Sequence, residues 1–340
     1  MGMIKNISER FGSRDIGIDL GTATVLVYVD GKGIVLNEPS VVAIDTVSDT
    51  ILKVGREAQA MMGRTPEHIK TVRPLKNGVV AQYDVTLHML KYFISRACGD
   101  MFFRPRVMIC IPGGISDVER RAVMDAALEA GARSVQLIAE PLAAAVGAGL
   151  KVNAPEGHLV VDIGGGTTDV AVVSLGGIVV SETVRVAGDQ FDEAIVRHVK
   201  NKYKVHIGER TAEQIKIRIG AVYEHKNFKT MKVRGRCMKE GLPKEITISS
   251  REMLEAMQEP ISEIIEVICR VVERTPPELI PDIIKNGITM AGGGSKLAGL
   301  DRLLADVTGI RAAVAKDAEL CVVNGTGMSL GKLSYDNKDN

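Results

Sequence analysis

Hydrophobic positions along this chain follow two alternating patterns, short runs of β-branched residues and longer stretches with helical spacing. Apolar side chains that recur every three or four residues are typical of helices, whereas continuous or alternating apolar runs are typical of strands. Helices are predicted over residues 117–130, 141–146, 211–220 and 251–273. Strands are predicted over residues 40–52, 134–139 and 283–290. This mixture of strands and helices indicates an α/β fold.

One stretch of the chain is repeated. Residues 19–35 and 162–179 each begin with an aspartate at the end of an apolar strand, continue through a turn of glycine and threonine, and end in two further strands. The leading aspartates, Asp19 and Asp162, are 143 residues apart, which is close to half the chain. A repeat at this distance predicts two similar α/β domains rather than an array of short units.

Each half of the chain also carries an insertion that interrupts the repeated plan. The insertion in the first half covers residues 33–75, and the larger one in the second half covers 185–250. The domains are therefore expected to comprise residues 13–32, 76–145 and 315–333 in the first, and residues 146–184 and 251–314 in the second. Residues 1–12 are expected to form a separate amphipathic N-terminal segment.

Composition narrows the class of protein without identifying it. The 340 residues are 45% hydrophobic and 25% charged with a net charge of +1, which argues against disorder and against global electrostatic capture of nucleic acid. Aromatic residues make up 4% and tryptophan is absent, so base-stacking platforms are not expected. The five cysteines are scattered and form no CxxC pair, which argues against disulfides and a zinc site. No apolar run reaches the roughly 18 residues that a membrane span needs.

The two repeated turns have the composition of phosphate-binding turns. Backbone N–H groups that no side chain covers can cradle phosphate oxygens, and threonine hydroxyls add further donors. An aspartate at the end of a buried strand is costly unless a cation meets it. A hydrated Mg²⁺ held through water by Asp19 and Asp162 would supply that charge. One such turn is common in plain hairpins, but two equivalent copies favour a shared phosphate site.

A third glycine-rich segment, residues 290–300, follows a predicted strand and leads into a predicted helix. Such a turn allows a phosphate or a flat ring to approach the backbone, although an ordinary strand-to-helix junction has the same composition. The common nucleotide motifs are missing from the sequence, because no GxGxxG follows a strand and residues 325–333 lack the spacing of a P-loop.

The three glycine-rich segments, with the intervening IPGGI (111–115) and AEPLAAA (139–145), resemble the superfamily of actin, the Hsp70 chaperones and sugar kinases. Four further segments resemble the bacterial actins of the MreB/Mbl family: NEPSVV (37–42), VERRA (118–122), IGERTAEQIK (207–216) and TPPEL (275–279). The resemblance extends from about residue 14 to 332. It implies an actin-like ATPase fold of two duplicated ribonuclease H-like domains, each with an inserted subdomain, and a nucleotide in the cleft between the domains.

The resemblance implies ATP or ADP and Mg²⁺ as cofactors, with Asp19 and Asp162 holding the metal through water. The residues expected to contact the phosphates are Thr22, Ala23 and Thr24 from one domain and Gly164, Gly165, Gly166 and Thr167 from the other. The residues expected to hold ribose and base are Glu213 and Lys216. The residues expected to line the adenine are Gly292, Gly293, Gly294, Ser295 and Lys296.

The expected catalytic residues are Glu140 and Thr167. Glu140 falls where the family places the residue that orients the attacking water, and a carboxylate there can hold a water proton while the γ-phosphoryl group leaves. A capping carboxylate at the start of a helix is the plainer interpretation of Glu140. Thr24, Ala139 and Asp169 depart from the commonest family residues. These departures put the hydrolysis rate in question, but not nucleotide binding.

Two segments predict contact with the inner face of a cytoplasmic membrane. The first has apolar residues on one helical arc of about 100°: Met3, Ile4, Ile7 and Phe11. The second is an apolar tip followed by arginines: Met101, Phe102, Phe103, Arg104 and Arg106. A short amphipathic helix binds lipid weakly unless many copies act together, as they would in a filament. Packing within the chain is the alternative for both segments.

One stretch of the chain is rich in basic residues, a feature that is also found in proteins that bind nucleic acid. It contains Lys226, Lys229, Lys232, Arg234, Arg236 and Lys239. Aromatic residues among them are limited to Phe228, so the solvated face of an edge strand explains the stretch better. No nucleic-acid partner is expected.

The resemblance therefore implies a slow magnesium-dependent ATPase, coupled to head-to-tail polymerisation into paired protofilaments. Such a protein would lie in the cytoplasm on the inner membrane face and guide the cell-wall elongation proteins that determine rod shape. A small-molecule kinase on the same fold is one alternative, although no general base aimed at a substrate hydroxyl is evident. An Hsp70-like ATPase is another, although the chain has no room for a peptide-binding domain.

Overall fold

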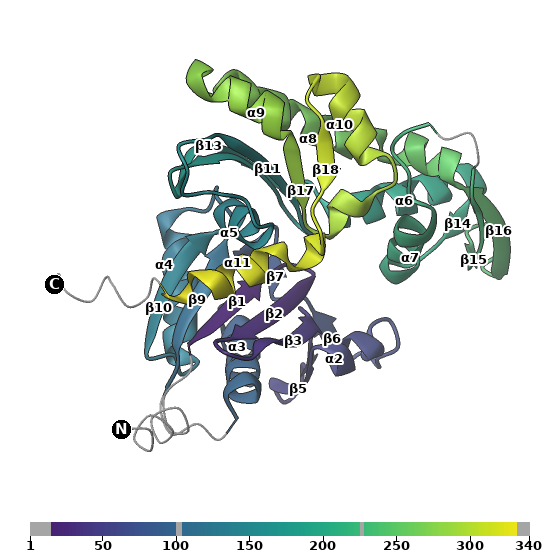
Figure 1. The fold of residues 1–340 in the computed structure, drawn as a ribbon. Coiled ribbons are helices and arrows are strands. Elements are labelled where there is room, and N and C mark those ends of the chain that lie inside the picture. Colours follow the sequence, from purple (N-terminus) through teal and green to yellow (C-terminus); the bar gives the residue numbers. More distant parts are fainter. Residues whose placement is uncertain (1–14, 100–103, 225–227, 332–340) are drawn as a thin grey trace. The chain divides into compact units, whose positions relative to one another are not determined.

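The computed structural model describes residues 15–99, 104–224 and 228–331, and the chain divides into two compact units (Figure 1). Unit 1 comprises residues 1–151 and 320–340, and unit 2 comprises residues 152–319. The sequence repeat places the changes of domain after residues 145 and 314, whereas the units change after residues 151 and 319. The subdomain divisions inside each unit stay predictions.

The central sheet of unit 1 has five strands in the order β10-β9-β1-β2-β3. They are β1 (Ile16–Leu20), β2 (Thr24–Val29), β3 (Gly33–Pro39), β9 (Arg106–Ile111) and β10 (Ser134–Ala139). β1 runs antiparallel to β2 and parallel to β9, and β9 runs parallel to β10. Val25 and Val27 are fully buried, so β-branched residues of the sequence repeat form part of the hydrophobic core.

Helices and a smaller group of strands complete unit 1. The helices are α2 (Arg56–Met61), α3 (Tyr83–Cys98), α4 (Asp117–Glu129), α5 (Glu140–Gly147) and α11 (Cys321–Ser329). The remaining strands are β4 (Val42–Asp45), β5 (Thr50–Val54), β6 (Ile69–Val72), β7 (Leu75–Lys76) and β8 (Val79–Val80). α4, α5 and β10 confirm the elements predicted over residues 117–130, 141–146 and 134–139.

α5 and α11 approach each other closely enough to require glycine. A Cβ atom on Gly147 would lie 1.8 Å from the carbonyl oxygen of Cys321, and one on Gly325 would lie 1.8 Å from that of Ala143. The contact is reciprocal. Gly147 faces the carbonyl of the residue four before Gly325, and Gly325 faces the carbonyl of the residue four before Gly147. No side chain fits at either position unless the helices move apart.

The central sheet of unit 2 has the order β13-β12-β11-β17-β18. Its strands are β11 (His158–Ile163), β12 (Thr168–Ser174), β13 (Gly177–Val184), β17 (Ile288–Ala291) and β18 (Ala312–Val314). β11 runs antiparallel to β12 and parallel to β17, as β1 does with β2 and β9 in unit 1. The two sheets therefore share one plan, which confirms the duplicated α/β domains that the sequence repeat predicts.

Helices and a second, small sheet complete unit 2. The helices are α6 (Gly188–Tyr203), α7 (Glu209–Ile219), α8 (Ser250–Glu273), α9 (Ile280–Asn286) and α10 (Leu300–Thr308). The small sheet has the order β14-β15-β16 and consists of β14 (Val205–His206), β15 (Thr230–Cys237) and β16 (Pro243–Ser249). α7 and α8 confirm the helices predicted over 211–220 and 251–273.

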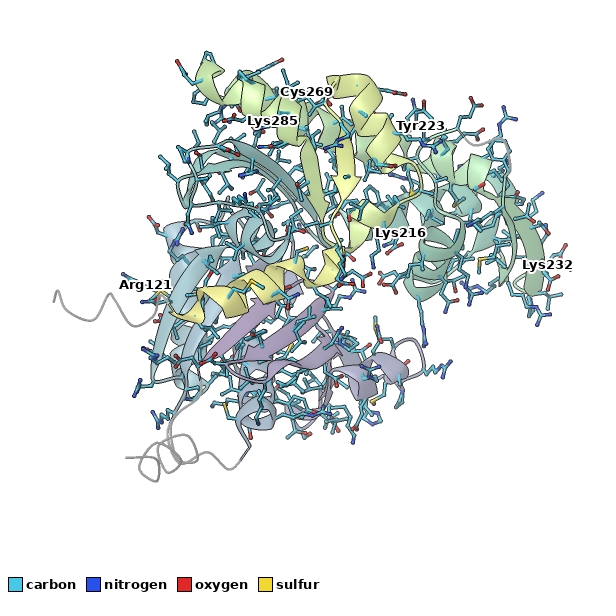
Figure 2. All side chains as sticks on the ribbon, in the orientation of Figure 1. Arg121, Lys216, Tyr223, Lys232, Cys269 and Lys285 are labelled. Carbon is cyan, nitrogen blue, oxygen red and sulfur yellow. The ribbon has the colours of Figure 1, made fainter. Side chains whose placement is uncertain are left out.

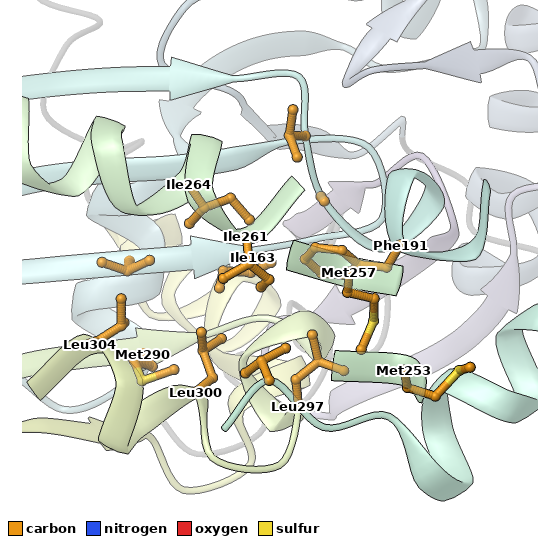
Figure 3. Packing of buried hydrophobic residues seen from close by; sticks show 14 of the residues in the cluster. Ile163, Phe191, Met253, Met257, Ile261, Ile264, Met290, Leu297, Leu300 and Leu304 are labelled. Carbon is orange, nitrogen blue, oxygen red and sulfur yellow. The ribbon is translucent and has the colours of Figure 1, made fainter. Parts of the chain in front are cut away.

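The core of unit 2 forms where α8 lies against the central sheet. Apolar residues at helical spacing on α8, among them Met253, Met257 and Ile264, are fully buried in one cluster with Ile163 and Met290 from the strands (Figure 3). Each such side chain contributes about 1.5–3 kcal/mol when it is fully buried. This core anchors the ends of β11 and β17, where the candidate site lies.

One predicted strand is wrong in its first half. Residues 280–286 form α9, and the strand begins only at Ile288. Pro281 fits the first turn of a helix, and Gly287, with φ of 82°, ends it in a conformation that favours glycine. The apolar run over 283–290 therefore belongs to two elements, which these two helix signals separate.

Three residues of the basic stretch, Lys232, Arg234 and Arg236, lie on β15, and Lys226 lies outside the described residues. β15 pairs with β16 along most of its length, whereas β14 pairs only with Arg236 and Cys237. β15 is therefore an edge strand over residues 230–235, as predicted, and a central strand only at its end. Lys232, Arg234 and Arg236 are exposed in alternation with buried or half-buried residues (Lys232 is labelled in Figure 2). The solvated face was predicted correctly.

Candidate functional site

The turn between β1 and β2 in unit 1 has the tight geometry that its glycine predicts. The N–H of Gly21 donates to the carbonyl oxygen of Thr24 at 3.1 Å. The hydroxyl of Thr22 accepts a hydrogen bond from the N–H of Gly78 at 2.9 Å, and Thr22 is buried. Thr24 is exposed at the start of β2. The predicted phosphate residues of unit 1 thus form one ordered turn.

Asp19 is the second-last residue of β1, close to this turn, and lies opposite Cys110 of the parallel strand β9. The Cys110 thiol donates to Oδ1 of Asp19 at 3.3 Å. Burial raises the pKa of Asp19 to about 6, and the hydrogen bond from Cys110 acts in the opposite direction. A nearby cation would favour the ionised carboxylate, so the surroundings of Asp19 suit a metal-linked role.

Glu140 is the first residue of α5 and follows β10 directly. Burial raises the pKa of the Cys110 thiol well above its usual value, and the charges of Asp19 and Glu140 add to this. Asp19 lies opposite Cys110, and Ala139, the residue before Glu140, lies opposite Ile111 of the same strand, so Asp19 and Glu140 lie at the same end of the unit 1 sheet. The predicted catalytic carboxylate therefore shares an edge with the predicted metal-linked one.

The turn between β11 and β12 in unit 2 is the counterpart of the Gly21 turn. The N–H of Gly164 donates to the carbonyl oxygen of Thr167 at 2.9 Å. Two amides at the start of α6 support the turn from outside, since the N–H of Gly188 donates to the Gly164 carbonyl at 3.2 Å and that of Asp189 to the Gly165 carbonyl at 2.7 Å. α6 therefore holds the backbone of residues 164–167 in place.

Asp162 is the second-last residue of β11 and is 5% exposed. It pairs in register with Asp169 of β12 and with Ala291 of β17. A Cβ atom on Gly292 would lie 2.5 Å from Oδ1 of Asp162 and 2.2 Å from the carbonyl oxygen of Ile163. The predicted adenine segment thus begins in direct contact with the predicted metal-linked carboxylate.

The rest of the adenine segment forms a 3₁₀ turn over Gly293–Lys296. The hydroxyl of Ser295 donates to the Gly292 carbonyl at 2.7 Å, and Gly294 packs on the Ile163 side chain. Lys296 forms an exposed ion pair with Glu319 at 2.9 Å. Gly292, Gly294 and Ser295 are therefore tied to the end of β11, whereas the charge of Lys296 faces a surface carboxylate.

Lys216 on α7 reaches back to the start of α6 (Figure 2). Its Nζ donates to the carbonyl oxygen of Gly188 at 2.9 Å and to Oδ2 of Asp192 at 2.8 Å. Glu213, one turn earlier on α7, is close enough for its charge to raise the pKa of Asp192. The predicted ribose and base residues of unit 2 thus adjoin the helix that supports the phosphate turn.

The sequence analysis missed Asp192. Asp192 lies among the core-facing positions of α6, with Phe191 and Ile195. A carboxylate at such a position needs a cationic partner, which was the available signal. The identity of that partner depends on how α6 and α7 pack.

Several predicted features lie outside the described residues. These are the membrane residues Met3, Ile4, Ile7, Phe11, Met101, Phe102 and Phe103. Arg106, expected beside the second membrane segment, instead forms an ion pair with Asp15 through two nitrogens. No helix in the described part of the chain combines the length and apolar character that crossing a bilayer requires. Over the same ranges, no group of three acidic, histidine or cysteine side chains forms a metal cage.

Comparison with known proteins gives one consistent family. The model of the MreB/Mbl protein family matches residues 13–338. The chain is 49% identical to the cell shape-determining protein Mbl of Bacillus subtilis over 94% of this chain and 97% of that protein. It is 48% identical to the cell shape-determining protein MreB of Escherichia coli over 99% of both chains.

Solved structures agree with the sequence comparison. MreB5 of Spiroplasma citri is 38% identical and superposes with a TM-score of 0.90 when bound to AMPPNP, covering 95% of this chain and 97% of that one. Its ADP-bound structure superposes with a TM-score of 0.92, covering 97% and 99%. These likenesses confirm the predicted actin-like fold.

Proposed function

The chain belongs to the MreB/Mbl protein family, and from this premise we propose that it binds and hydrolyses ATP as a filament-forming bacterial actin. The observation that carries the proposal is that the same arrangement of an aspartate and a glycine turn occurs at one edge of the central sheet in both units. In each unit, an aspartate is the second-last residue of a strand, and a turn closed by a glycine N–H follows it; these aspartates are Asp19 and Asp162. The relatives support the ligand, since MreB5 has been solved with AMPPNP and with ADP.

We propose that both units contribute to one nucleotide site. Residues 22–24 and 164–167 bind the phosphates, Glu213 and Lys216 hold ribose and base, and residues 292–296 line the adenine. Support comes from unit 2, where the phosphate turn, Lys216 and Gly292 are linked by short contacts around α6 and β11. Backbone N–H groups and a lysine are suitable donors for an anionic ligand.

The residues also suit Mg²⁺. Asp19 and Asp162 are carboxylates at the ends of equivalent strands, and burial raises the pKa of Asp19. Mg²⁺ usually keeps several waters and takes one or two carboxylates together with substrate phosphates, so a cage of three protein ligands is not required. When bound, the ion supplies positive charge that offsets the negative charge of the phosphate oxygens.

Glu140 is proposed to orient the attacking water. It stands at the first position of α5, whose backbone N–H groups favour negative charge there, and it shares a sheet edge with Asp19. A carboxylate held at this position can accept a hydrogen bond from water during phosphoryl transfer. Thr167, buried in the opposite repeat, is proposed to contact the phosphate being transferred.

Assembly and location extend the proposal. The names of the relatives from B. subtilis and E. coli point to a role in cell shape. We propose that the chain forms paired protofilaments on the inner face of the cytoplasmic membrane, held there by the segments 3–11 and 101–103, and guides cell-wall elongation proteins.

Co-sedimentation with nucleotide and lipid tests the proposal. The purified chain, mixed with ATP, Mg²⁺ and anionic vesicles, should pellet as filaments and release phosphate. Glu140→Ala should still bind nucleotide and pellet but release phosphate about 100-fold more slowly. A chain that stays monomeric and indifferent to lipid, or phosphate release that depends on an added sugar, would contradict the bacterial-actin function.

A further inference from the structure

Asp192 occupies a position that the proposed nucleotide site does not by itself explain. It lies one turn after Gly188 on α6 and is 8% exposed. A carboxylate buried to this extent costs several kcal/mol of unfolding free energy unless it is paired. Its Oδ2 accepts a hydrogen bond from Lys216 Nζ at 2.8 Å, so the partner comes from α7.

Lys216 is thereby directed toward the phosphate turn. The same Nζ donates to the Gly188 carbonyl at 2.9 Å, and the Gly188 N–H donates to the Gly164 carbonyl at 3.2 Å. A Cβ atom on Gly188 would lie 3.2 Å from Lys216 Nζ and 3.3 Å from the Gly164 carbonyl oxygen. Three short contacts therefore link Asp192 to the turn over residues 164–167, and no side chain fits comfortably between them.

Asp192 also affects Glu213. Glu213 and Lys216 are three residues apart on α7, a spacing at which opposite charges on one helix attract each other. The hydrogen bonds of Lys216 go to Asp192 and to the Gly188 carbonyl, and not to Glu213. The carboxylate of Glu213 is then available for hydroxyl donors such as those of ribose.

We propose that Asp192 is a positioning residue that holds Lys216 against the phosphate turn and keeps Glu213 available for the sugar. This inference rests on the proposed nucleotide site and names a residue that acts on it through Lys216. In this arrangement, α7 and the phosphate turn are coupled, so loss of Asp192 weakens the hold on the whole nucleotide.

The ion pair responds to pH. Burial raises the pKa of Asp192 to about 7, Lys216 opposes that rise, and Glu213 and Asp189 add to it. As the pH falls through about 7, Asp192 takes up a proton and its attraction for Lys216 declines. Nucleotide affinity should therefore fall between pH 8 and pH 6 wherever both members of the pair are present.

A double-mutant cycle tests the proposal on the full chain, with AMPPNP and ADP as probes. Asp192→Asn and Lys216→Met should each raise the dissociation constant about tenfold, as expected for a lost charge-assisted hydrogen bond. The double variant should bind no more weakly than either single variant, because both changes remove one interaction. The decline in affinity from pH 8 to pH 6 should be clearly smaller in all three variants than in the wild-type chain, since only the protonation of the nucleotide's own phosphate remains.

The control is Arg197→Gln. Arg197 lies on α6, as Asp192 does, and forms an exposed ion pair with Glu259 of α8. This variant should change neither the nucleotide affinity nor its pH dependence. Unchanged affinity in Asp192→Asn, or additive losses in the double variant, would overturn the proposal. If Asp192→Asn does not fold, the test rests on Lys216→Met alone. A Lys216→Met variant whose nucleotide affinity keeps the wild-type dependence on pH would then overturn the proposal. If the wild-type chain binds no nucleotide, the proposed function itself has failed.

Discussion

The two units use one strand plan, but they surround its carboxylate differently. In unit 1, Asp19 lies opposite a cysteine thiol, and its turn is fastened to Gly78 by the Thr22 hydroxyl. In unit 2, Asp162 pairs in register with Asp169, and its turn is fastened by amides of α6. The repeated backbone therefore presents a carboxylate and a turn twice, while the neighbouring elements determine the chemistry at each copy.

The difference suggests a division of labour. The unit 1 edge carries Glu140 at the same end of the sheet as Asp19, which fits the proposed role of Glu140 toward the attacking water. The unit 2 edge links its turn to α6, α7 and the segment 292–296, which fits the proposed hold on the nucleoside. Under the proposed function, the two copies of the fold would separate catalysis from binding without a change in the sheet.

The largest expected effect comes from removing the unit 2 carboxylate. Asp162→Ala should abolish binding of magnesium nucleotide, because it removes the buried carboxylate that is proposed to hold the metal from unit 2. Asp19→Ala should weaken binding less, since Asp19 keeps some contact with solvent and water can replace part of its role. Calorimetric titration with Mg·ADP measures both. Equal affinity in Asp162→Ala and the wild-type chain would contradict the proposed site.

The second-largest expected effect is a loss of stability when the close contact between Gly292 and the end of β11 is disturbed. Gly292→Ala places a Cβ atom 2.2 Å from the Ile163 carbonyl oxygen at a φ of 77°, so it should cost about 3 kcal/mol of unfolding free energy. Gly293→Ala is the matched control, because its Cβ would meet nothing closer than 3.8 Å. Urea unfolding compares the two. Similar midpoints for both variants would show that the contact does not constrain the segment.

The smallest expected effect concerns the capping boxes at the N-termini of two helices, one in each unit. Ser116 and Glu119 form a capping box at α4 of unit 1, and Ser249 and Glu252 form one at α8 of unit 2. Burial acts to raise the pKa of Glu252, but hydrogen bonds from Tyr203, Lys202 and Ser249 outweigh it and hold that pKa at about 2. The pKa is thus lowered by folding, so the stabilisation is complete above pH 4.5 and is lost as the pH falls toward 2.

Glu252→Gln should therefore lower the unfolding free energy at pH 7 by about 1–2 kcal/mol. Glu119→Gln should lower it by about 0.5 kcal/mol, the low end for a cap in an exposed position. The difference in unfolding free energy between the two variants should become smaller as the pH is lowered from 5 to 3. Thermal unfolding at several pH values measures it, and a gap that is constant with pH would exclude Glu252 as the cause.

Sequence patterns predicted much of the fold because the relevant signals are local. The strand that ends in Asp19 or Asp162, the glycine turn after it, and the amphipathic spacing of α8 each depend on residues within one or two turns. The same patterns were wrong over residues 283–286, where an apolar run fits a strand or a buried helix equally well. Pro281 and Gly287 carry the information that separates the two.

The amino-acid sequence was sufficient to establish the duplicated α/β plan, the two aspartate turns and the family resemblance, since all of these follow from short-range order. Only the folded chain could bring Cys110 to Asp19 across 91 residues, Lys216 to Asp192 across 24, and Gly147 to the Cys321 carbonyl. Such contacts depend on which faces of strands and helices pack together. Periodicity reveals that a face is buried, but the partner that covers it is decided by tertiary packing.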